Sequence, residues 1–179
     1  SISADYSGLA ADVKAAFAGI TTQTGKITLT DATVSVADIN TVAGVTSGEV
    51  IAIATETDAA TLIGLTTTGT DAITVTMAAT STSGADLNTI DSKTSVAVNA
   101  GNVTAITGSA TEIAAAYAAN TAGTITGLGN EPVTITGTAV ATLAELKAIN
   151  NATSGTITLN AESISADYSG LAADVKAAF

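Results

Sequence analysis

The chain has 179 residues and contains no Cys, His, Trp or Arg, and its sixteen acidic residues against five lysines give a net charge of −11. Nucleic-acid binding is excluded because neutralising phosphates requires clustered Lys and Arg, and a disulfide framework is excluded because there is no Cys. No apolar run approaches the roughly 20 residues of a membrane-spanning helix. Hydrophobic residues make up 46% of the chain but aromatic residues only 3%, so we expect a folded core of aliphatic side chains.

Short strands and short helices are predicted to alternate along the chain. Apolar residues alternate with small polar ones, as in a half-buried strand, in KITLT (26–30), VIAIA (50–54), AITVT (72–76), SVAVN (95–99), TITG (124–127) and TITLN (156–160). Five other segments start with an acid and carry apolar or Ala residues one and four positions later, on one helical face. These are DVKAA (12–16), DINTV (38–42), DLNTI (86–90), EIAAA (112–116) and ELKAI (145–149).

Four of the predicted helices begin with a capping-box pattern. Ser or Thr stands three residues before the acid, where its side chain accepts a backbone N–H bond and the acid reciprocates; these residues are Ser35, Ser83, Ser109 and Thr142. We expect longer helices only within 7–19, 111–120 and 142–150, and single turns elsewhere.

A long exact repeat dominates the organisation of the chain. Residues 163–179 are identical to residues 1–17, SISADYSGLAADVKAAF, with a shift of 162. We interpret 1–162 as one complete tandem repeat unit and 163–179 as the start of the next. Natural tandem repetition and engineered duplication of the end both remain open.

Within each 162-residue unit the strand and helix pattern recurs about six times, starting near residues 26, 49, 71, 95, 124 and 156. Units of this size bury their apolar faces by stacking on neighbours. The expected fold is therefore mainly β with short helices, a parallel β-solenoid or α/β solenoid of about six coils per repeat. An array of small β-sandwiches is the alternative, and the absence of Asn-Gly and Asp-Gly hairpin turns argues against it.

The sequence offers little catalytic or metal chemistry. Ser-His and Cys-His nucleophile arrangements are impossible without His or Cys, so we expect no enzyme and no catalytic or cofactor-binding residue. Calcium binding is not indicated by a motif, and Asp31, Asp58 and Asp71 at turns are only weak candidate ligands. Asn102 and Asn151 begin N-x-T sequons and are candidate glycosylation sites.

The recurring segments VSVADINTVAGVTSG and VTITGTAVATLAELKAINNATSGTITL, in a chain without Cys or Arg, resemble very long tandem-repeat surface proteins of cyanobacteria and marine Gram-negative bacteria. The resemblance covers the whole chain and implies an adhesin, an S-layer-like coat or a surface fibril. Many such proteins carry calcium-binding nonapeptide repeats, which this chain lacks.

The sequence therefore predicts a structural segment of a bacterial extracellular filament, surface coat or giant adhesin. Its expected partners are adjacent repeat units, assembled end to end, and no nucleic acid or membrane. A module that binds glycans or another surface is the alternative function.

Overall fold

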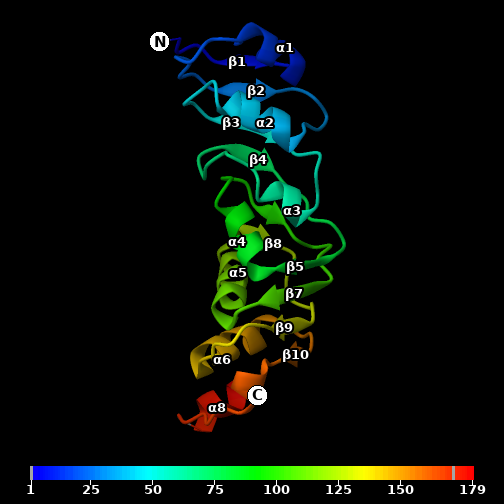
Figure 1. Cartoon of the computed structure of the whole chain (residues 1–179), viewed down its shortest axis with the longest axis vertical. Helices are drawn as coiled ribbons and strands as arrows, with labels where there is room; N and C mark the ends of the chain where they lie inside the picture. Colours follow the sequence, from blue (N-terminus) through cyan, green and yellow to red (C-terminus); the bar gives the residue numbers. More distant parts are fainter. Residues whose placement is uncertain (1, 171) are drawn as a thin grey trace. The chain divides into compact units, whose positions relative to one another are not determined.

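The computed structural model describes residues 2–170 and 172–179, which form an α/β fold (Figure 1). The strands are β1 Tyr6–Gly8, β2 Ile27–Leu29, β3 Val50–Ile53, β4 Ala72–Thr74, β5 Ser81–Ser83, β6 Val98–Asn99, β7 Ala105–Gly108, β8 Ile125–Thr126, β9 Val133–Ile135 and β10 Ile157–Thr158. The helices are α1 Ala10–Ala16, α2 Val36–Ala43, α3 Ala59–Leu62, α4 Gly84–Asp91, α5 Ala110–Ala122, α6 Leu143–Ala152, α7 Ala161–Ile164 and α8 Ala172–Ala178.

The expected mainly β fold, a parallel β-solenoid or α/β solenoid of about six coils, is wrong. The described part of the chain is 34% helix and 20% strand. Helices α2 and α4 span eight residues each where only single turns were predicted. The strand patterns of four or five residues form strands of two to four residues, partly because side chains take strand amides. Val50 N donates to Asp71 Oδ1 at 2.7 Å, and Ile73 N donates to Thr94 Oγ1 at 3.0 Å.

The chain divides into two compact units. One runs up to Thr76 and includes Thr89–Val98, and the other contains Met77–Asn88 and Asn99–Phe179. In the first unit β1, β2, β3 and β4 form a parallel sheet in chain order. In the second unit β10, β9, β7 and β5 form a parallel sheet in that order. Helices lie in the connections, as parallel pairing requires long crossovers.

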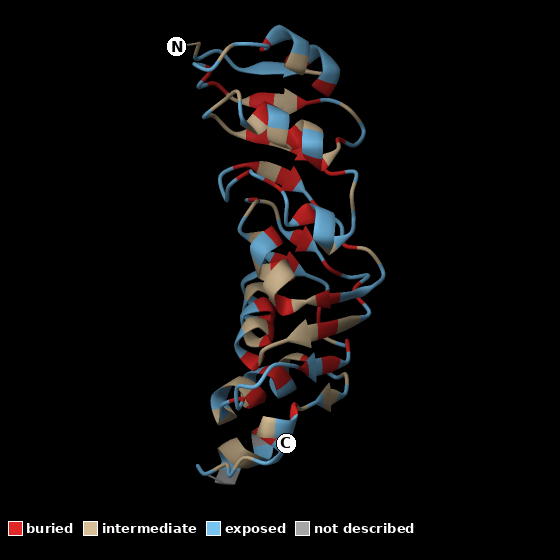
Figure 2. Cartoon of the chain, viewed as in Figure 1, coloured by how far each residue is buried: buried red, intermediate tan, exposed pale blue. Residues whose placement is uncertain are grey.

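In-register pairing brings apolar residues of successive strands into contact. Ile27 pairs with Val50 in the first unit, and Ile106 pairs with Val133 in the second. All four are at most 1% exposed, and each such burial is worth roughly 1.5–3 kcal/mol relative to exposure. Figure 2 shows buried residues along strands and on helices in each unit. In the predicted strands 26–30 and 50–54 the period-2 pattern therefore identified the buried face correctly.

The four predicted N-caps are confirmed. Ser35 Oγ accepts from Asp38 N at 3.2 Å, and Ser83 Oγ accepts from Asp86 N at 3.0 Å. Complete capping boxes form at Ser109 and at Thr142, where the glutamate three residues later bonds back to the cap amide. The local sequence thus fixes where α2, α4, α5 and α6 begin.

Turns of successive segments approach each other closely at glycines. An ideal Cβ on Gly48 would lie 2.4 Å from the Gly25 carbonyl oxygen, and one on Gly155 would lie 2.1 Å from the Glu131 carbonyl oxygen. Threonine hydroxyls join the same turns: Thr46 Oγ1 donates to Gly25 O and accepts from Gly48 N. The turns at Gly48 and Gly155 are therefore each bonded to the turn about twenty residues earlier and lack space for a side chain.

In the described part of the chain, no helix is both long and apolar enough to cross a membrane.

Gly48→Ala should lower the free energy of unfolding by about 1–3 kcal/mol, because backbone atoms occupy the space that the added methyl group needs. This is the usual cost of forcing an extra methyl group into a packed site. Gly44→Ala is the matched control, since Gly44 has φ −73° and its Cβ would lie 3.4 Å from the nearest atom. It should leave stability unchanged or raise it slightly. Denaturant titrations compare the two variants, and equal losses would contradict the close-approach explanation.

Candidate functional site

The three weak calcium candidates each accept backbone N–H bonds in the first unit. Asp31 Oδ2 accepts from Ala10 N at 2.7 Å and so caps α1, whose own N-cap residue, Leu9, provides no side-chain bond. Asp58 caps α3 by accepting from Thr61 N, and hydrogen bonds from Thr61 lower the pKa of Asp58. Asp71 accepts from the amides of Val50 and Thr68. The structure does not bring them together.

Among the described residues no group of three or more acidic side chains is placed to hold a metal ion. The carboxylates of Asp31, Asp58 and Asp71 accept from backbone donors at two helix starts and at one strand end. At a helix start such donors lack partners within the helix.

The two sequon asparagines lie in different settings. Asn102 is exposed in a turn, and its Nδ2 donates to Met77 O at 3.2 Å. Asn151 is exposed within α6, and the threonine of its sequon, Thr153, is buried and donates to Glu131 O.

A buried carboxylate that the sequence analysis did not single out lies in the second unit. Glu131 is 3% exposed, and its side chain accepts from Gly129 N and from the Tyr117 hydroxyl at 3.3 Å. Burial, together with the neighbouring Glu131 carboxylate, raises the pKa of Tyr117 to about 12. The only proline of the chain follows Glu131 and was the available sequence signal of a constrained turn.

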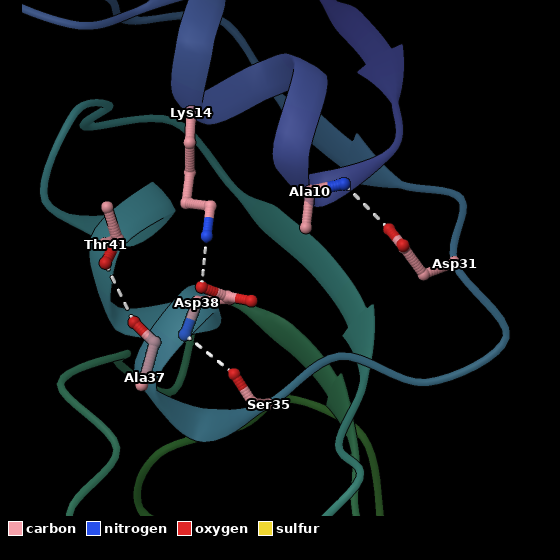
Figure 3. A network of polar contacts seen from close by, with 7 residues as sticks. All are labelled: Ala10, Lys14, Asp31, Ser35, Ala37, Asp38 and Thr41. Atoms are coloured by element: carbon pink, nitrogen blue, oxygen red, sulfur yellow. Dashed lines mark hydrogen bonds and ion pairs between the residues drawn. The ribbon is translucent and has the colours of Figure 1, made fainter.

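The first copy of the repeated segment packs against α2. Lys14 reaches from α1 to Asp38 in the first turn of α2, where Ser35 caps the helix (Figure 3). The hydrogen bond from Lys14 lowers the pKa of Asp38. A groove of about 320 Å³ follows this contact and is lined in part by Lys14, Phe17 and Val42. This copy therefore uses the Lys14 side of α1 to contact the helix that follows it.

The second copy packs against the helix that precedes it. Lys147 of α6 forms an ion pair with Asp174 of α8 at 2.5 Å. A Cβ on Gly170 would lie 2.9 Å from Leu143 Cδ2, so the segment also approaches the start of α6 closely. This copy therefore uses the Asp174 side of α8, and Asp174 is the counterpart of Asp12.

The aromatic pair of the segment is the same in both copies. The rings of Tyr6 and Phe17 meet edge to face with centroids 5.0 Å apart, and those of Tyr168 and Phe179 meet with centroids 5.2 Å apart. Edge-to-face pairs of this kind add about 0.5–1.5 kcal/mol beyond area burial. The ring contact thus forms within the segment itself, whichever neighbour the segment packs against.

The residue two positions after the motif acid links each of four helices to the next part of the chain. Lys14 contacts Asp38, and Lys147 contacts Asp174. Asn40 Nδ2 donates to Gly64 O at 2.8 Å, and Asn88 Nδ2 donates to Glu112 O at 3.0 Å. The sequence analysis missed this role, although the shared place of Asn40 and Asn88 in DINTV and DLNTI was the signal.

The chain matches no protein-family model, no curated protein and no solved structure.

Lys14→Ala should lower the free energy of unfolding at neutral pH by about 0.2–1 kcal/mol, the range for exposed ion pairs. Because the folded-state pKa of Asp38 lies below its ordinary value of 3.8, this stabilisation is present above that value. It is lost as the pH falls through the folded-state pKa, so variant and parent should converge in acid. Denaturant titrations at neutral and acidic pH measure both effects.

Lys176→Ala is the matched control, because Lys176 occupies the same place in the identical sequence, is exposed, and is in neither described ion pair. It should leave the free energy of unfolding unchanged. Equal losses for the two lysines would show that the contact with α2 contributes nothing.

Tyr117→Phe should remove an alkaline loss of stability. The folded chain holds the Tyr117 proton more tightly than the unfolded chain, whose tyrosine pKa is 10.0. The resulting stabilisation is complete below pH 10 and is lost as the pH rises towards about 12. Thermal unfolding across this range should show a falling midpoint for the parent and a smaller fall for Tyr117→Phe. Tyr6→Phe, at a 41% exposed position, should behave like the parent.

Proposed function

We propose that the chain is a structural segment of a bacterial tandem-repeat protein that forms an extracellular filament, surface coat or giant adhesin. The observation that carries the proposal is the exact recurrence of residues 1–17 at 163–179, with each copy packed on a different neighbouring helix. A segment that contacts a following helix in one place and a preceding helix in the other is suited to joining repeats.

The chemistry of the surface supports the same proposal. A net charge of −11 with only 12% charged residues leaves a surface solvated largely by Thr, Ser, Asn and Gly. The acids with resolved partners bond to backbone amides, threonine or tyrosine hydroxyls, or lysines. Contacts of this type hold a fold together, and the proposal needs no reaction chemistry.

Labelling of source cells with an antibody raised against the purified chain tests the proposal. Intact cells should be labelled, and the label should follow fibres or a continuous coat in electron micrographs. Cells lacking the gene and an antibody against a cytosolic protein are the controls. Labelling only after permeabilisation would overturn the extracellular assignment.

A glycan array separates the structural role from the adhesive alternative. The purified chain should bind no glycan above the level of a denatured sample of the same chain. Saturable binding to one glycan class would favour an adhesive module over a structural segment.

A further inference from the structure

We infer that residues 168–179, identical to 6–17, form a two-sided joint that holds α6 of one repeat on one side and α2 of the next repeat on the other. The inference rests on the proposed function, because its partner is a second copy of the 162-residue repeat. The structure contains each half of this joint once, at a different copy of the same sequence.

The two halves use different sides of one helix. The contact with α6 is made through Asp174, whose counterpart Asp12 is exposed, and the contact with α2 is made through Lys14, whose counterpart Lys176 is exposed. Residues two apart lie about 200° apart around a helix, which places them on opposite sides. Neither contact therefore occupies the side chain that the other needs.

Exposure of the aromatic pair is complementary in the two copies. Phe17 is 4% exposed beside α2, whereas Phe179 is 63% exposed. Tyr6 is 41% exposed, whereas Tyr168 is only partly exposed in the copy that packs on α6. Each copy thus exposes more of the ring that the other copy covers better, and a segment with both neighbours would bury its phenylalanine and cover its tyrosine in part.

The polar contacts between successive helices follow a regular spacing, and the same spacing occurs at the joint. In four helices the residue two positions after the motif acid bonds forward, and in two of them the partner is the side chain of the next motif acid, Asp38 or Asp174. Lys176 continues this series and pairs with Asp38 of the next repeat. Asp12 accepts from Lys147 of the preceding repeat.

The backbone conformation of the segment also differs between the two copies. Tyr6–Gly8 forms β1 on Ile27–Leu29, whereas the identical residues 168–170 form no strand. Upstream the copies differ: Ile2 N donates to Thr22 O, and Ile164 N donates to Asn160 O within α7. The joint therefore begins at Tyr168.

Cross-linking within a two-repeat chain, made of residues 1–162 followed by residues 1–179, tests the joint. The chain lacks Cys, so introduced thiols are unique. One pair is Lys147→Cys of the first repeat with Asp12→Cys of the second, and the other is Lys14→Cys with Asp38→Cys of the second repeat. Asp12 and Lys14 of the second repeat are the residues numbered 174 and 176 when the chain is counted continuously. A short bis-maleimide and peptide mass mapping report which pairs are joined in one molecule.

Single-chain variants provide the controls. Lys147→Cys with Asp174→Cys, and Lys14→Cys with Asp38→Cys, should each cross-link in the 179-residue chain. Lys147→Cys with Lys176→Cys should not, because Lys176 lies on the side of α8 opposite Asp174, the residue that contacts Lys147 of α6. In the two-repeat chain most molecules should carry both cross-links, and molecules with one cross-link and two free thiols would overturn the joint.

Hydrogen exchange of the unsubstituted two-repeat chain gives a second measurement. Amides of the internal joint should exchange more slowly than the same amides in either copy of the single chain, because both sides are packed. Exchange no slower than in the better protected copy would overturn the inference even if the cysteine variants fail to fold. Neither result depends on where the protein resides, so failure of the joint differs from failure of the surface assignment.

Discussion

The close, in-register approach of segments about twenty residues apart is the constraint on which the rest of the structure depends. At Gly25 and Gly48 in one unit, and at Gly127 and Gly155 in the other, the backbones of successive turns leave no space for a Cβ. This contact sets the register of the parallel strands, and the register in turn aligns Ile27 with Val50. Polar side chains then bond to the equivalent part of the next segment rather than to water.

Features encoded by neighbouring residues could be predicted from the sequence. The capping boxes at Ser109 and Thr142 depend on residues three positions apart, and the buried faces of strands follow from simple alternation. The lengths of strands and helices could not be predicted this way. The ladder at Val50 stops because Asp71, twenty-one residues later, takes its amide.

The candidate site could likewise be predicted only in part. The exact repeat was visible in the sequence and identified the segment that matters, but its contacts were not. Asp31 caps α1 from twenty-one residues away, and no local pattern signals that it replaces the missing cap at Leu9. No pattern near Lys14 or Lys147 signals their ion pairs, because the partners lie in other helices. Pairing between distant segments requires knowledge of the register, which only the folded chain provides.

The exact identity of the two copies means that the same seventeen residues meet two sets of neighbours within one chain. The difference in exposure between Phe17, at 4%, and Phe179, at 63%, is therefore set by the surroundings and not by the segment itself. A substitution made in one copy perturbs one set of contacts and leaves the unchanged copy as an internal reference.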